Sequence, residues 1–116
     1  MAATDAPALS AVAFELAVEL DLYEHEIARL AHGPFDPEAY QRASRHVDRM
    51  RLYVATLPAV SVAWVEVMIR HFELTHGIWR LQKDPAAAVD LQQLHAPLLA
   101  AVQRLAHKCV QLMPSA

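Results

Sequence analysis

Apolar residues recur at alternating spacings of three and four in four separate runs of this chain, and this pattern is the strongest constraint on its fold. The runs extend from Leu9 to Leu30, from Tyr40 to Leu57, from Val60 to Leu81 and from Leu91 to Leu112. Such spacing places an apolar stripe along one side of an α-helix, and the stripe must be buried against other helices. The chain is therefore predicted to form four amphipathic helices.

Proline and glycine mark the ends of the first runs. Gly33-Pro34 stops the first predicted helix, because glycine favours a helix C-terminus and proline cannot continue the helix. Asp36-Pro37 then offers a capping carboxylate followed by a proline at the first helical position, and Pro58 sets the next boundary. The connections between runs are short, so consecutive helices are predicted to lie antiparallel.

The start of the fourth helix is predicted from a second Asp-Pro pair, Asp84-Pro85. Asp90 and Gln93 have the spacing of a further capping box inside this helix. Pro97 has no backbone N–H to donate, so we expect the fourth helix to kink or restart near residues 93–97.

The composition agrees with a helical fold. The chain has 116 residues, which predicts a single domain spanning 1–116. It contains only two glycines and no asparagine, whereas the tight turns of all-β folds need both residue types. We therefore predict an all-α fold, an antiparallel up-down four-helix bundle whose fourth helix is kinked near Pro97. A helical array is the weaker alternative, because no repeat period of 20–50 residues is present.

Charge and cysteine content narrow the class of protein. The formal net charge is −3, so the chain lacks the basic character typical of nucleic-acid partners. Its single cysteine, Cys109, cannot form an internal disulfide and is expected to be a buried thiol. The most apolar window, Leu57 to Ile69, is too short to span a bilayer and contains Glu66. These features predict a cytoplasmic protein with no membrane partner and make a nucleic-acid partner unlikely.

The predicted helix over 60–81 has more apolar surface than one bundle core needs. Beside its core stripe runs a second apolar stripe, formed by Val65, Met68, Phe72 and Trp79. A broad contact with the core is one interpretation. The other is that this stripe is an interface covered by a second copy of the chain, since large exposed apolar patches are unusual on monomers.

The first two predicted helices carry opposite charge. Acidic residues predominate over 9–30, whereas Arg42, Arg45 and Arg49 share one face of the helix over 40–57. Attraction between the two helices explains this asymmetry without any ligand. A small site for an anion or phosphate is the alternative interpretation.

Two histidines, His71 and His95, occupy core positions of the third and fourth predicted helices, about one turn apart, and His46 reaches a similar level from the second. The expected state of His71 and His95 is buried, neutral and hydrogen-bonded. A metal or ligand site built from these three histidines is the alternative. Metal sites in helical bundles usually need carboxylates from facing helices as well, and this chain has no Cys-x-x-Cys-His motif. We therefore expect no metal and no cofactor.

One part of the second half is similar to a known family. The residues are Leu57-Pro58, Trp64 through His71, Leu74 through Trp79, and Leu94 through Leu98. They resemble the second half of HEPN domains, especially the HepT type, which are α-helical, usually dimeric and carry an Arg followed by a polar residue and a His. The resemblance implies metal-independent RNA cleavage at a dimer interface, often within a toxin–antitoxin pair. Arg70 would match the Arg, His71 the polar residue and His76 the His.

Taken together, the residues favour an interaction protein over an enzyme. The chain has no Gly-rich phosphate loop, no Gly-x-Ser-x-Gly and no His-Glu-x-x-His. We expect a small cytoplasmic helical protein that acts as a protein-interaction or regulatory module, pairs with itself and offers a surface to another protein. A HEPN-like ribonuclease, or an inactive toxin–antitoxin relative, is the alternative. A histidine-based ligand or metal-binding bundle is the second alternative.

Overall fold

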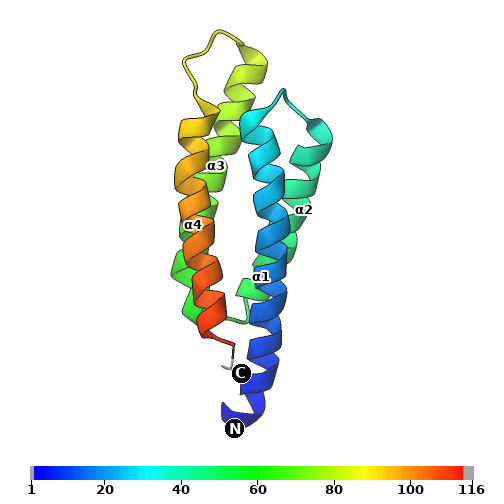
Figure 1. The fold of residues 1–116 in the computed structure, drawn as a ribbon, viewed down its shortest axis with the longest axis vertical. Helices are drawn as coiled ribbons and strands as arrows, with labels where there is room; N and C mark the ends of the chain where they lie inside the picture. Colours follow the sequence, from blue (N-terminus) through cyan, green and yellow to red (C-terminus); the bar gives the residue numbers. More distant parts are fainter. Residues whose placement is uncertain (1, 114–116) are drawn as a thin grey trace.

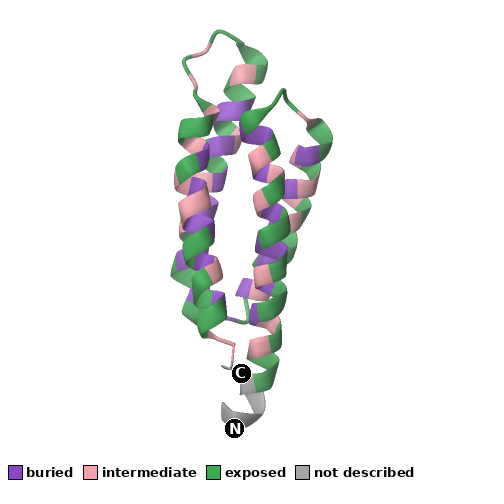
Figure 2. Cartoon of the chain, viewed as in Figure 1, coloured by how far each residue is buried: buried purple, intermediate pink, exposed green. Residues whose placement is uncertain are grey.

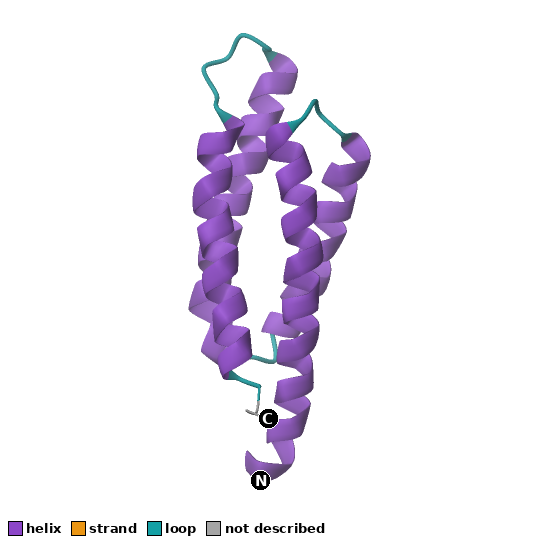
Figure 3. Cartoon of the chain, viewed as in Figure 1, coloured by secondary structure: helices purple, strands orange, loops and turns teal. Residues whose placement is uncertain are grey.

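The computed structural model of the chain describes residues 2–113 and is an antiparallel four-helix bundle (Figure 1). The helices are α1 (Ala2–His32), α2 (Pro37–Val54), α3 (Ser61–Lys83) and α4 (Leu91–Gln111), with a short 3₁₀ turn, η1 (Pro58–Val60), before α3. Over the described residues there is no strand, as Figure 3 shows. The predicted all-α bundle is confirmed.

The molecule is elongated, with extents of 57 × 23 × 22 Å. The closest backbone approaches join α1 to α2, α1 to α4 and α3 to α4. The structure can therefore be described as two helical hairpins, α1–α2 and α3–α4, joined through η1. Among the helices of the described part of the chain, none is long and apolar enough to cross a membrane.

The core is formed where the four predicted apolar stripes meet (Figure 2). Its largest fully buried side chains include Leu16, Leu20 and Tyr23 of α1, and Met50, Leu74, Leu98 and Leu105 of the other helices. The predicted stripe of α1 begins at Leu9, but Leu9 is partly exposed because α1 projects past the ends of its neighbours (Figure 1).

Aspartate caps set the starts of α2 and α4. The Asp36 carboxylate accepts hydrogen bonds from the backbone N–H groups of Glu38 and Ala39, both at 3.1 Å. Asp90 accepts in the same way from Gln92 and Gln93, at 3.0 and 3.4 Å. Each cap satisfies N–H groups that have no partner within the helix.

The predicted start of the fourth helix at Asp84-Pro85 is wrong. Asp84 accepts a hydrogen bond from the backbone N–H of Ala86, but this closes a turn, and α4 begins only at Leu91 (Figure 3). Because α3 continues to Lys83, a helix starting at Pro85 would leave one residue for the reversal of direction. Antiparallel helices need at least about two residues for that connection.

Of the predicted kink or restart near Pro97, the restart does not occur, since α4 is continuous from Leu91 to Gln111 with Pro97 inside it. Pro97 removes one backbone hydrogen bond, the one that would reach the carbonyl of Gln93. Gln93 is exposed, so water can satisfy that carbonyl.

Gly77 of α3 lies close against Leu94 of α4 and Val89 of the loop before α4. A Cβ at this position would lie 2.6 Å from Leu94 Cδ1 and 3.2 Å from Val89 Cγ1. Leu94 Cδ1 is the end of a flexible side chain, so one methyl group can be accommodated, whereas a larger side chain overpacks the contact.

We expect Gly77→Leu to lower the free energy of unfolding by about 1–3 kcal/mol, although leucine is the better helix former. Gly77→Ala is the matched control, in which improved helix propensity offsets a small clash. Urea unfolding followed by circular dichroism measures both variants. Equal stability of the leucine and alanine variants would show that this contact is not tight.

Candidate functional site: the outer face of α3

The exposed surface of α3 carries a continuous apolar stripe, which we call the α3 outer face. Its members are Val62, Val65, Ile69, Phe72 and Trp79, and each is between 53% and 83% exposed. Their positions advance by three and four residues, with His76 filling the one gap, so they form a single line along the helix. This line points away from the bundle core, against which the opposite side of α3 packs.

The α3 outer face differs from the predicted interface at one residue. The structure places Val65, Phe72 and Trp79 on the surface, but Met68 is buried at 9% exposure and packs in the core. Including Met68 was therefore wrong, because the core contact of α3 is broader than its central stripe of residues. The sequence analysis also missed Val62 and Ile69, although the three-and-four spacing from Val65 was a signal for both.

Polar residues beside the α3 outer face are engaged with other partners. Glu66 forms an ion pair with Arg104 of α4, and Arg70 donates to Glu73 Oε1 at 3.0 Å. These pairs occupy the side of α3 that turns toward α4. They leave the apolar stripe itself uncovered.

Near the C-terminal end of α3, Trp79 is held by residues of its own helix. The His76 ring stacks on the Trp79 ring, with centroids 5.6 Å apart and planes 23° apart. Lys83 Nζ lies 4.9 Å from the centroid of the Trp79 ring, which is a cation–π contact. Trp79 is thus fixed in orientation while more than half of its surface stays exposed.

The structure does not bring Arg70 and His76 together. Arg70 is paired with Glu73, whereas His76 is stacked on Trp79. Six residues of α-helix rotate their side chains about 120° apart. Within one copy of the chain, the pair implied by the HEPN resemblance does not form a common site.

The three core-level histidines also lie in separate places, each bonded to a different residue of α1. Tyr23 Oη lies 2.7 Å from His71 Nδ1, His32 Nε2 lies 3.2 Å from His95 Nδ1, and His46 bonds to Glu19. His71 and His95 are both 8% exposed. No group of three metal-ligating side chains occurs within the described residues. The sequence analysis missed His32 and the buried Glu19 as partners.

Burial shifts the pKa values of His71, His95 and Tyr23. Desolvation, with a further effect of the Arg51 charge, lowers the pKa of His71 from 6.5 to about 4. Desolvation, followed by the neighbouring His32, also lowers the pKa of His95. Burial raises the pKa of Tyr23 well above its usual range, so its hydroxyl stays protonated beside His71 Nδ1.

The predicted attraction between α1 and α2 is present as specific ion pairs. Arg42 Nε lies 3.0 Å from Glu26 Oε2, and Arg49 Nη1 lies 3.9 Å from Glu19 Oε1. Two of the three arginines named from the sequence therefore have carboxylate partners on α1. This accounts for much of the charge on that face of α2 without an anion.

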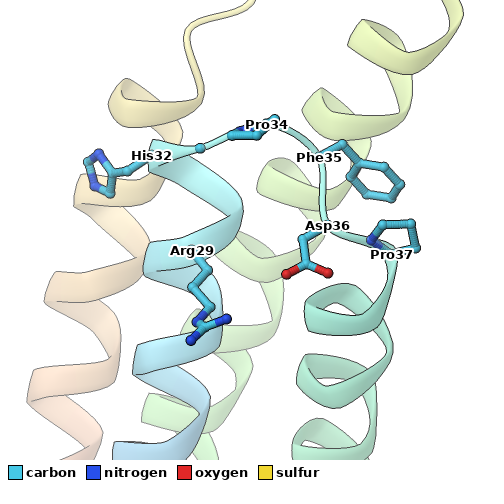
Figure 4. Close-up of a pocket in the computed structure, with 7 residues that line it drawn as sticks. Arg29, His32, Pro34, Phe35, Asp36 and Pro37 are labelled. Carbon is cyan, nitrogen blue, oxygen red and sulfur yellow. The ribbon is translucent and has the colours of Figure 1, made fainter.

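A shallow hollow lies at the turn between α1 and α2 (Figure 4). Its polar side chains do not converge: Arg29 and His32 point in different directions, and the Asp36 carboxylate caps α2. A binding site for a small molecule needs a few polar groups aimed at one point. This hollow therefore lacks the features of such a site.

Comparisons with protein-family models, curated proteins and solved structures gave no match to this chain. The basis for a function is therefore the chain's own surface, on which the α3 outer face is a line of five exposed apolar side chains.

Proposed function

We propose that this chain is a helical protein-interaction module that pairs with a second copy of itself through the α3 outer face. The observation that carries the proposal is the line of five large apolar side chains, each more than half exposed, along one helix. Water contact with such a line costs free energy that burial against a partner would recover.

The size of the face supports a protein partner. The two aromatic and three aliphatic side chains of the face, each more than half exposed, together present roughly 500 Å² to water. That is near the upper end of about 300–600 Å² for the largest patch on a typical monomer. It is also close to the apolar share of one side of a standard interface, which buries about 800 Å² per partner.

A second copy is the partner we favour. It is present wherever the chain is present, and a two-fold axis allows the same apolar line to meet itself. Beside the face, Glu66, Arg70 and Glu73 already have partners within the chain, so none of these three needs to lose an ion pair when the face is covered. We further propose that the protein works in the cytoplasm, since its one cysteine is buried and unpaired.

RNA cleavage of the HEPN kind is the lesser candidate. His76 lies within the α3 outer face, where a second copy would reach it, but Arg70 is paired with Glu73 and turned away. Interaction without catalysis needs no rearrangement of either residue.

Sedimentation equilibrium over a range of concentrations tests the proposal. We expect a species of twice the 12.9 kDa of one chain at micromolar concentration, dissociating on dilution. A mass of one chain at every concentration up to about 100 μM would contradict self-association, because a specific interface of this size is expected to bind more tightly than that.

A further inference from the structure

Besides the apolar core that they share, the two helical hairpins are joined to each other by two side-chain hydrogen bonds, and both involve histidine. Tyr23 of α1 bonds to His71 of α3, and His32 of α1 bonds to His95 of α4. Among the described residues, every other side-chain hydrogen bond or ion pair between different helices lies within one hairpin. Those are Arg42–Glu26, His46–Glu19 and Arg49–Glu19 in α1–α2, and Arg104–Glu66 in α3–α4.

The Tyr23–His71 bond joins two buried side chains. The tyrosine hydroxyl can donate its hydrogen to an unprotonated Nδ1 of His71 or accept a hydrogen from a protonated one. Protonation of His71 would therefore keep this contact but place a charge in the core, with a neutral hydroxyl as the partner of Nδ1. The charged residue that faces His71 from α2 is Arg51, also a cation, and the other ring beside it is Phe72 of α3 itself. No carboxylate within ion-pair distance is present among the described residues to stabilise the protonated ring.

The His32–His95 bond requires one ring nitrogen without a proton, because two protonated ring nitrogens cannot bond to each other. His32 is exposed, whereas His95 is buried and its Nε2 has no hydrogen-bond partner. The titratable neighbour of His95 is His32, from α1, which becomes a like charge when it is protonated. Two protons on the pair would leave two cations 3.2 Å apart with no acceptor between them.

The α1–α2 hairpin has polar contacts that do not depend on histidine. Arg42–Glu26 and Arg49–Glu19 are ion pairs that join the same two helices. In the α3–α4 hairpin, Arg104–Glu66 is likewise an ion pair that histidine protonation does not touch. Mild acid therefore weakens the polar contacts between the hairpins and spares those within them.

We propose that the bundle is a proton-operated hinge, in which protonation of His71 and His95 releases the α3–α4 hairpin from the α1–α2 hairpin while each hairpin stays paired. The chain would bend between α2 and α3, where residues 55–60 join the hairpins.

The direction in which pH shifts the equilibrium between closed and open forms follows from the pKa of His71, which is about 4 in the closed bundle and 6.5 for an ordinary histidine. The closed form is fully favoured above about pH 6.5 and loses its advantage as the pH falls toward 4. At pH 5, His71 alone shifts the equilibrium toward the open form by about 30-fold relative to pH 7.5.

Distances between spin labels test this proposal. In a Cys109→Ala background, labels at Asp21→Cys and Gln103→Cys span the two hairpins, and labels at Asp21→Cys and Arg45→Cys lie within one. Labelled chain is diluted into an excess of unlabelled chain, so that only distances within one copy are read. From pH 7.5 to pH 5, we expect the first distance to lengthen and broaden and the second to stay constant.

Two variants connect the opening to the histidines. His71→Gln with His95→Gln removes both titrating groups, so the distance between hairpins should stay short at pH 5. Should that variant fail to fold, Tyr23→Phe serves instead, because loss of the hydroxyl removes one of the two side-chain hydrogen bonds between the hairpins and should move the opening to higher pH. The proposal is overturned if the distance between hairpins is unchanged at pH 5, if both distances change together, or if neither variant alters the pH of opening.

Discussion

Leu20→Asp is expected to abolish cooperative folding of the bundle. Leu20 is 1% exposed and lies in the core on α1, the helix that packs closely against both α2 and α4. The new carboxylate would lie within the apolar core cluster. Such a charge costs several kcal/mol, a large share of the roughly 5–15 kcal/mol that stabilises a domain of this size.

Far-ultraviolet circular dichroism during heating measures this effect. Leu22→Asp is the matched control, since Leu22 is two residues away on the same helix and is 45% exposed. The control should keep the helical signal and the thermal transition of the wild type to within a few degrees. A Leu20→Asp chain that melts as the wild type does would show that α1 does not pack as described.

Phe72→Glu combined with Trp79→Glu is expected to give a folded monomer. Both side chains are more than half exposed, so the change should leave the bundle intact. In a two-fold dimer it would place four carboxylates in an apolar interface and remove four aromatic contacts. We expect the dissociation constant of the dimer to rise at least 100-fold, since loss of a single buried aromatic side chain already costs about 1.5–3 kcal/mol.

The matched control has the same two new charges on another exposed apolar surface. Phe14 and Leu22 lie on the exposed side of α1, at 56% and 45% exposure, and Phe14→Glu with Leu22→Glu should leave the dimer intact. Sedimentation equilibrium compares the two double variants at equal concentration. An α3 variant that remains dimeric would place the interface elsewhere, and one that unfolds would show that these residues support the core.

The helices and their order could be predicted because apolar spacing and proline boundaries are local signals. The rotation of a helix about its own axis is not local. Met68 lies at the edge of the α3 core stripe, and whether it faces the core or water depends on how closely the neighbouring helices approach. Sequence spacing therefore showed that α3 has two apolar sides but misassigned the residue at their border.

Contacts between helices were harder to predict for a related reason. His71 and His95 could be assigned to the core from their positions, but their partners Tyr23 and His32 depend on the relative register of α1, α3 and α4. A shift of one helical turn, about 5.4 Å, would change both partners. Similarly, Asp84-Pro85 and Asp90 both have the local pattern of a helix start. Because α3 continues to Lys83, the fourth helix begins after Asp90.

Hydroxyl-radical footprinting of the wild-type chain tests most directly whether a second copy covers the α3 outer face. Oxidation of Phe72 and Trp79 is compared at concentrations where sedimentation gives a monomer and where it gives a dimer, with exposed Phe14 of α1 as the internal reference. We predict that Phe72 and Trp79 become several-fold less reactive in the dimer while Phe14 is unchanged. Equal reactivity of Phe72 and Trp79 in both states, or protection of Phe14 instead, would contradict the proposed interface.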